Sequence, residues 1–235
     1  MKLTLVRHAT LLVEVNGRRL LVDPMLGAAG TAPPIENTPN QVPNPLVELP
    51  VAAEEVVRGL DGCVVTHLHR DHLDPAAEAL LPRGLPVLTQ PESLAELRSR
   101  GLAATADAAG WLALDIVRTG GRHGTGAIGE AMGPVSGFVI EGLYVAGDTI
   151  WCDEVQEAIE RHAPHTTVVN GGGARFLEGD PITMTVDDVR RTREAAGGRV
   201  VVCHLEAINH CVERRDAYRG LDGVDVPADG ETLDY

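Results

Sequence analysis

Three imidazoles and two carboxylates fall within nine residues of this chain, in the stretch THLHRDHLD at residues 66–74. Zinc and similar ions prefer imidazole and carboxylate ligands, and catalytic sites commonly combine three protein ligands with one open position. His67 and His69 are two residues apart, so on an extended segment both side chains point the same way. Asp71 and His72 follow where the chain turns. Two such pairs on one loop favour two metal ions, each of which needs a further ligand from elsewhere.

Candidates for these further ligands lie at the ends of other predicted strands. His123 sits in a glycine-rich loop after a strand, Asp148 follows Gly147 at the end of another, and His204 follows the buried run 200–203. Functional groups of open sheets gather at such strand ends. His210 competes with His204, and we favour His204 because a buried strand leads directly into it.

Short strands that alternate with helices are predicted to position these residues. The cluster follows an apolar strand at 62–65 and precedes a helix that starts at Asp74-Pro75, while Asn16-Gly17 is a strong hairpin turn signal. The order favours an α/β (α+β) fold with two mixed sheets packed face to face and helices outside. We expect strands at 2–7, 10–15, 19–23, 62–65, 86–88, 103–105, 112–118, 135–140, 143–146, 166–169, 199–203 and 224–226. We expect helices at 51–60, 75–81, 91–100, 153–162, 185–196 and 213–219, and a glycine-rich loop at 120–133.

Residues 26–50 form a long predicted loop, punctuated by eight glycines and prolines. Loops of this length inside a compact domain are uncommon and are usually functional or disordered. A linker between two domains is the alternative, but the three strands before it are too few to make a domain. We therefore expect one domain over residues 1–235, with a lid-like loop at 26–50.

The charge of the chain limits its partners. The formal net charge is −14, with an isoelectric point near 5.0. Nucleic acid and anionic membranes are poor partners because both are bound through basic surfaces. Two divalent ions would offset part of this charge locally. The expected partner is a small-molecule substrate, and a homo-oligomer stays open.

The remaining composition is typical of a globular protein of the cytoplasm. Hydrophobic residues make up 44% and aromatic residues 3%, so the core must rest on aliphatic side chains. The first residues meet a charge too early for a signal peptide, and no apolar run approaches the length of a membrane span. The four cysteines are scattered, without a CxxC pair, which favours buried free thiols in a reducing compartment.

The pattern HxHxDH at residues 67–72, followed by the Gly-flanked His123, Gly147-Asp148-Thr149 and a strand-end His204, resembles the metallo-β-lactamase fold superfamily. Within it, Arg7-His8-Ala9-Thr10 and Leu21-Val22-Asp23-Pro24 look like the small metal-dependent hydrolases that include ascorbate-phosphate lactonases and N-acyl-phosphatidylethanolamine phospholipases. The likeness covers nearly the whole chain. It implies a four-layer αββα sandwich with the site at one edge.

The resemblance also implies a ligand set. One metal would be held by His67, His69 and His123, and the second by Asp71, His72 and His204. Asp148 would bridge the two. Zinc suits these nitrogen and oxygen ligands best, but manganese and iron suit them too.

The expected chemistry is hydrolysis by a hydroxide formed from water between two divalent ions, which lower its pKa toward neutrality. Asp71 is the candidate to orient this nucleophile or relay its proton, and His210 is a second catalytic candidate that shapes the pocket. Asp23 is a candidate to orient a ligating histidine. His8 either contacts a metal ligand or the substrate, or is a structural histidine. Asn170, Trp151, Glu206 and Asn209 are further candidates near the same edge.

We therefore expect a metal-dependent hydrolase of a small lactone, ester, amide or phosphodiester. The alternative is an iron-dependent oxidoreductase on the same fold, although diiron members are expected to carry a carboxylate where His69 stands. A nuclease disagrees with the charge. A non-catalytic binding protein disagrees with the complete ligand set, and a β-lactamase proper with the ligand set and the cytoplasmic indications.

Overall fold

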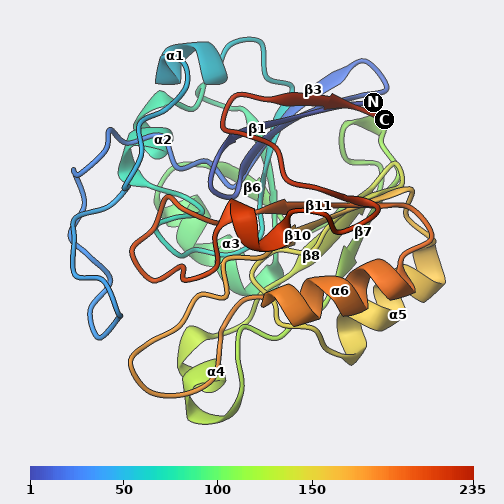
Figure 1. The fold of residues 1–235 in the computed structure, drawn as a ribbon. Coiled ribbons are helices and arrows are strands. Elements are labelled where there is room, and N and C mark those ends of the chain that lie inside the picture. The colour runs from blue at the N-terminus through green and yellow to red at the C-terminus, as the bar shows by residue number, and fades with distance from the viewer.

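Two mixed β-sheets lie face to face at the centre of the computed structural model, which describes residues 1–235 (Figure 1). The strand order is β13-β1-β2-β3-β4-β5-β6 in the first sheet and β12-β11-β10-β9-β8-β7 in the second. The first sheet contains β1 (Lys2–Arg7), β2 (Thr10–Val15), β3 (Arg18–Val22), β4 (Gly62–Val65), β5 (Pro86–Thr89), β6 (Ala103–Thr105) and β13 (Thr232–Asp234). The second contains β7 (Ile116–Thr119), β8 (Gly137–Ile140), β9 (Leu143–Val145), β10 (Thr166–Asn170), β11 (Arg199–Cys203) and β12 (Val224–Asp225).

Parallel pairing brings several strand ends to one edge of the molecule. Strands β3 to β6 are parallel, and so are β9 to β12, whereas β13-β1-β2-β3 and β7-β8-β9 are antiparallel. The predicted turn at Asn16-Gly17 joins β2 to β3, and both residues have positive φ (47° and 74°), as this kind of turn requires. The segments that follow β3, β4, β9 and β11 carry site residues from both sheets.

Helices cover the outer face of each sheet, as Figure 1 shows for α5 and α6 on the second sheet. Helix α5 (Asp153–His162) and α6 (Val186–Ala195) bury Val155 and Val189 against that sheet. The first sheet is covered by α1 (Ala53–Val56), α2 (Pro75–Leu80) and α3 (Pro91–Ser99). The expected αββα sandwich is therefore confirmed.

Aliphatic side chains fill the space between the sheets. Leu3, Leu5 and Val13 of the first sheet pack against Phe138 and Val201 of the second, in a cluster of 19 buried residues. Full burial of each such side chain contributes roughly 1.5–3 kcal/mol. The frame under the site is therefore held by a continuous apolar layer, with few aromatic residues.

Several predicted elements have different bounds. The loop predicted at 120–133 contains α4 (Gly126–Met132). The helix predicted at 51–60 shrinks to α1, and the helix predicted at 213–219 is a 3₁₀ turn, η2 (Arg215–Tyr218). The strand predicted from 112 begins only at Ile116, after a 3₁₀ turn, η1 (Trp111–Ala113). Strand β13 was not predicted, because three residues with a single apolar side chain are too few to show a strand pattern.

The segment 26–50 has no helix or strand, and its only ladder contact is a bridge between Ala32 and Asn44. None of the helices combines the length and the apolar character that crossing a membrane demands. All four cysteines are free; Cys63, Cys152 and Cys203 are buried, and Cys211 is partly buried.

Candidate metal centre

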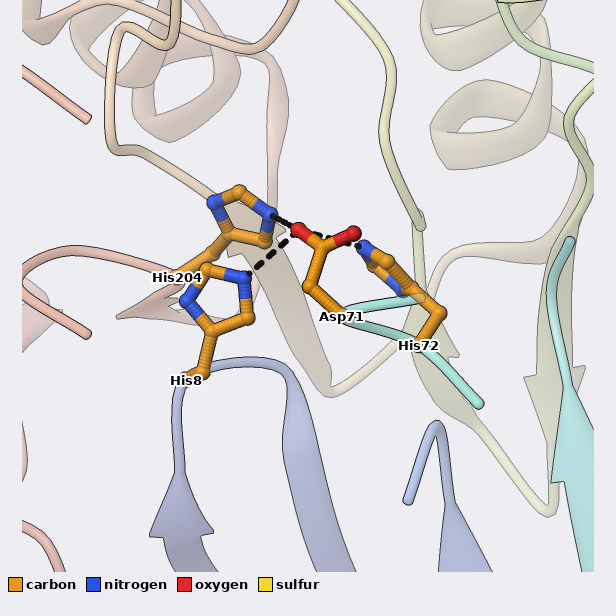
Figure 2. A group of neighbouring side chains, drawn as sticks. All are labelled: His8, Asp71, His72 and His204. Atoms are coloured by element: carbon orange, nitrogen blue, oxygen red, sulfur yellow. Dashed lines mark hydrogen bonds and ion pairs between the residues drawn. The ribbon is translucent and has the colours of Figure 1, made fainter. Parts of the chain in front are cut away.

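Two groups of metal-ligand side chains lie side by side at the strand ends, and in each group the ligand atoms lie within 4.8 Å of one another. The structure thus brings together all seven residues that the sequence predicted as ligands, and it adds one more, His8. The first group contains His67, His69, His123 and Asp148. The second contains His8, Asp71, His72 and His204 (Figure 2).

The first group converges on a small volume. His67 Nε2 lies 2.9 Å from His69 Nδ1, which lies 3.2 Å from His123 Nε2. Asp148 Oδ2 is 3.4 Å from His123 Nε2 and 3.9 Å from His67 Nε2. Donors bound about 2.0–2.1 Å from one tetrahedral ion lie roughly 3.3 Å apart. These separations fit the edges of a single coordination polyhedron.

The second group is arranged around the Asp71 carboxylate, whose contacts with its neighbours Figure 2 shows. Asp71 Oδ2 lies 3.0 Å from His8 Nε2, 3.4 Å from His204 Nε2 and 3.9 Å from His72 Nε2. The Nε2 atoms of His72 and His204 are buried and have no hydrogen-bond partner. Buried polar atoms seldom stay unpaired, so two such atoms directed at one carboxylate fit a site built for a divalent ion.

Asp148 lies between the two groups. Its Oδ2 is 3.2 Å from His72 Nε2, and its Oδ1 is 3.4 Å from His204 Nε2. Gly147 delivers it: the residue has φ +72°, and an added Cβ would lie 2.9 Å from Ser136 O, so only glycine fits this tight turn. Asn170 Nδ2 donates to Asp148 Oδ1 at 2.6 Å and fixes the carboxylate. This is the position that a bridging ligand needs.

The carboxylates create a demand for positive charge in the site. Burial alone would raise the pKa of Asp148, but His204 and His72 outweigh it and hold that pKa well below its ordinary value. Although burial opposes it, Asp148, Asp23 and Asp71 together raise the pKa of His72 to about 10. In contrast, burial and the neighbouring His72 hold the pKa of His67 well below its usual value. Bound cations would take the place of the protons that these carboxylates attract.

Asp23 orients two of the histidines, as the sequence suggested for one. His72 Nδ1 donates to Asp23 Oδ2 at 2.8 Å. Thr66 Oγ1 donates to the same oxygen, which leaves the hydroxyl to accept the Nδ1–H of His67 at 3.0 Å. Both rings thus turn Nε2 toward the site, as ligating histidines require.

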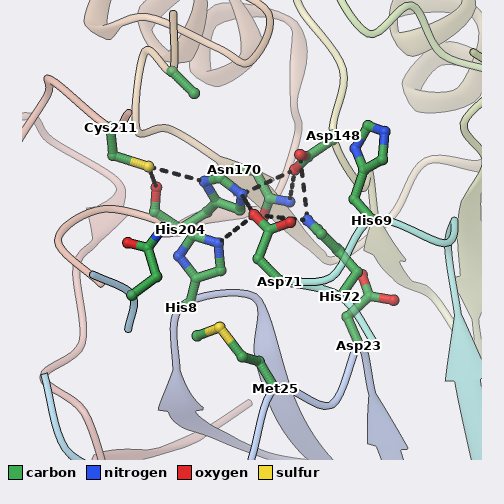
Figure 3. A network of polar contacts seen from close by, with 12 residues as sticks. His8, Asp23, Met25, His69, Asp71, His72, Asp148, Asn170, His204 and Cys211 are labelled. Carbon is green, nitrogen blue, oxygen red and sulfur yellow. Dashed lines mark hydrogen bonds and ion pairs between the residues drawn. The ribbon is translucent and has the colours of Figure 1, made fainter. Parts of the chain in front are cut away.

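Two other ligand candidates have different partners at their second nitrogen. His123 Nδ1 donates to the carbonyl of Ile182 at 2.7 Å. His204 Nδ1 lies 3.4 Å from Cys211 Sγ, a contact also drawn in Figure 3. The backbone at this edge is unusual, because His8, Asp23 and His204 all have positive φ (60°, 44° and 59°). Non-glycine residues adopt this conformation rarely, and the conformations cluster at functional sites.

A cavity of about 610 Å³ opens over the two groups. His69, Asp71 and His123 form part of its lining, and so does His210. His210 is buried, its Nδ1 has no partner, and burial lowers its pKa to about 4. The loop 26–50 contributes eight of the 21 lining residues, from Gly27 to Pro45.

The structure separates the other candidates by their contacts. Asn170 contacts Asp148, and Asn209 binds the loop 26–50. Glu206 pairs with Arg215 and does not line the cavity, and neither does Trp151. Cys211 was not predicted, since nothing in its sequence surroundings points to His204. The Arg7-His8-Ala9-Thr10 segment between two strands was the available signal for His8.

Comparisons with known proteins agree with this geometry. Residues 18–205 match the beta-lactamase superfamily domain. Over its full length the chain is 33% identical to the full-length UPF0173 protein YddR of Bacillus subtilis. It is 28% identical over 207 residues, 82% of the chain and 90% of the relative, to the UPF0173 metal-dependent hydrolase MJ1163 of Methanocaldococcus jannaschii.

A solved structure, the isothiocyanate hydrolase from Delia radicum gut bacteria, superimposes with a TM-score of 0.90 and 32% identity, covering 100% of this chain and 99% of that one. Fold, ligand groups and relatives thus agree over almost the whole length. The chain belongs to the β-lactamase superfamily and, within it, to the metal-dependent hydrolases.

Proposed function

We propose that this protein hydrolyses a small molecule and that it uses two divalent metal ions held by the two side-chain groups. Zinc is the metal that we propose. The position of Asp148 carries the proposal, because its carboxylate lies within reach of both groups. Its Oδ2 is 3.4 Å from His123 Nε2 of the first group and 3.2 Å from His72 Nε2 of the second, and its Oδ1 is 3.4 Å from His204 Nε2. His67, His69 and His123 would hold one ion, and Asp71, His72 and His204 the other. Ions held there would supply Lewis acidity and lower the pKa of water to near neutrality.

Residues of the chain have distinct roles in this proposal. Asp71 stays ionised, because its pKa lies well below the usual value: burial would raise it, and His72 and His204 outweigh that effect. Its Oδ2, which also accepts from His8 Nε2, is then available to accept a hydrogen bond from the attacking water and to orient it. His210 lines the cavity and is therefore placed to contact the substrate there.

Lactones, esters, amides, phosphodiesters and isothiocyanates are the bonds to test. The likeness to the isothiocyanate hydrolase favours including the last class. In that reaction water adds to the central carbon of R–N=C=S, and the products are the amine and carbonyl sulfide. The cavity of about 610 Å³ suits small substrates of this kind.

The experiment combines metal analysis with a substrate panel. Protein purified without added metal, and protein loaded with zinc, manganese or iron, is analysed for metal per chain and assayed on one compound of each class. We expect two ions per chain and turnover of at least one class. Asp148→Asn should lose bound metal and turnover. Asp61→Asn should keep the metal and the turnover, because this carboxylate binds Arg18 and Arg19 on the first sheet.

The outcomes separate the alternatives. One ion per chain with full activity would overturn the dinuclear centre. Iron in the purified protein, with a redox-active spectrum and no hydrolysis, would favour the oxidoreductase.

A further inference from the structure

Much of the cavity lining outside the two ligand groups is apolar. Besides the histidines and Asp71, the wall contains prolines 33, 34 and 45 of the loop 26–50. Six larger apolar side chains complete it: Met25, Ile35, Met132, Phe176, Ile182 and Ile208. They come from four separate segments of the chain, so the apolar wall is assembled by the tertiary fold.

Two of the three charged groups in this lining already have partners. The three groups are Arg70, Asp71 and Asp74. Asp71 belongs to the second ligand group, and Asp74 accepts from Ala77 N and Gly27 N, both at 2.7 Å. Arg70 is exposed and has no ion pair. The apolar side chains of the wall themselves offer no partner to a buried charge.

Asn209 holds this wall in place through its side chain and its backbone. Its Oδ1 accepts from Ile35 N at 3.0 Å and from Asn44 Nδ2 at 2.8 Å. Its Nδ2 donates to Thr38 Oγ1 at 2.7 Å and to the carbonyl oxygens of Ile35 and Asn40. Asn209 N donates to Asn44 Oδ1 at 2.9 Å, and Asn209 is only 2% exposed. The loop is thereby fixed to the segment that bears Ile208 and His210.

Arg7 ties the two ends of the same loop. Its guanidinium is fully buried and donates to the carbonyl oxygens of Met25 and Gly27, both at 2.8 Å, and of Val47 at 3.0 Å. The loop 26–50 is therefore held at both ends by Arg7 and in its middle by Asn209. A wall held in this way is preformed, which lowers the entropy lost when a ligand binds.

We infer that the substrate carries an apolar substituent, which lies against this wall, and that Asn209 is the positioning residue that shapes the wall. The inference rests on the proposed function, since it describes the same site. It narrows the substrate class to compounds with an alkyl or aryl substituent at this position.

The test measures binding without turnover. Unbranched alkyl hydroxamates, from acetohydroxamate to octanohydroxamate, are titrated calorimetrically into the zinc-loaded protein, with ω-carboxylate hydroxamates of equal length beside them. We expect affinity to rise about threefold to fourfold per methylene over the first few carbons, the gain typical of a buried methylene. The ω-carboxylate compounds should bind at least tenfold more weakly than their alkyl counterparts.

Asn209→Ala should keep its zinc content and its affinity for acetohydroxamate but lose most of the gain per methylene. Asn40→Ala is the matched control, because Asn40 lies in the same loop, its side chain is exposed and only its backbone carbonyl contacts Asn209. The unmodified protein tests the substrate class even if Asn209→Ala fails to fold.

The result that overturns the inference differs from the result that overturns the proposed function. If acetohydroxamate binds but affinity is flat with chain length, or the ω-carboxylates bind as tightly, the apolar wall has no such role and the hydrolase stands. If the protein takes up no zinc and no hydroxamate binds, the proposed function fails and the inference fails with it. An Asn209→Ala variant that keeps the full gain per methylene contradicts the positioning role alone.

Discussion

Asp23 shows how much of the site depends on a residue that is not a candidate ligand. It binds His72 directly and His67 through Thr66, so one carboxylate sets the direction of a ring in each ligand group. Such outer partners fix the tautomer and the orientation of ligating histidines.

Replacing this carboxylate should weaken metal binding without unfolding the protein. For Asp23→Asn we expect metal affinity to fall about 10-fold to 100-fold, the usual effect of losing such a partner. The amide of the variant would present a donor or a weaker acceptor to His72 Nδ1, and the ring would lose its fixed orientation. Competition with a chromophoric chelator measures the change, and an unchanged affinity would contradict the role of Asp23.

At this scale the spacing of residue types predicted the ligand candidates well. Strand-end positions pointed to His123, Asp148 and His204, and the structure brings all three next to the histidines and Asp71 of residues 66–74. The position of His8 beside Asp71 could not be read from spacing, because it depends on how the turn between β1 and β2 meets the second sheet. The contact of Cys211 with His204 depends likewise on the path of an irregular segment.

Helix α6 begins with a capping box formed by Thr185 and Asp188. Thr185 Oγ1 accepts from Asp188 N, and the Asp188 side chain accepts from Thr185 N, so two otherwise unpaired backbone donors are satisfied. The helix covers the second sheet, which delivers Asp148 and His204.

Removing this cap should lower stability and leave the ligand groups in place. Thr185→Ala is expected to cost about 1 kcal/mol in the free energy of unfolding, and roughly 2–4 °C in melting temperature for a chain of this size. Thr125→Ala is the control, since Thr125 is the N-cap of α4 but makes no side-chain cap hydrogen bond. Urea unfolding monitors both variants; equal losses would show that the cap contributes nothing specific.

Elements with clear periodicity were predicted closely, and elements held by tertiary contacts were not. Strand β11 and helix α5 have the predicted bounds because their apolar patterns and end signals agree. Helix α4 was missed because its glycines predict a loop, yet Gly129 permits a close turn in which an added Cβ would meet Gly124 O at 2.7 Å. The order of strands and helices indicated two mixed sheets packed face to face, and the resemblance to a family indicated the four-layer arrangement with the site at one edge.

At the scale of the whole molecule, metal and fold should be coupled. The ligand candidates come from segments between residues 8 and 204 and meet only in the folded chain, so ions that bind here stabilise it. At a free metal concentration 100 times the dissociation constant, each ion is expected to add about 2.7 kcal/mol to the free energy of unfolding.

Calorimetric melting in the presence of zinc and of a chelator checks this coupling. We expect the melting temperature to fall when the metal is removed, and the fall to be smaller in Asp148→Asn, because this variant lacks the shared ligand. In Asp61→Asn the fall should equal that of the unmodified protein. A melting temperature independent of metal would mean that ions do not bind at the two groups.

The left-handed backbone at His8, Asp23 and His204 lowers the stability of the fold but places side chains that the site needs. Each such residue costs about 1 kcal/mol or more relative to ordinary backbone, and all three lie at the same edge of the sandwich. Substitutions that increase stability would therefore be expected at these positions, for example exchange for glycine. Such substitutions would remove side chains that face the two ligand groups. The apolar side chains between the sheets do not face the two ligand groups, so stabilising exchanges there would leave the site unchanged.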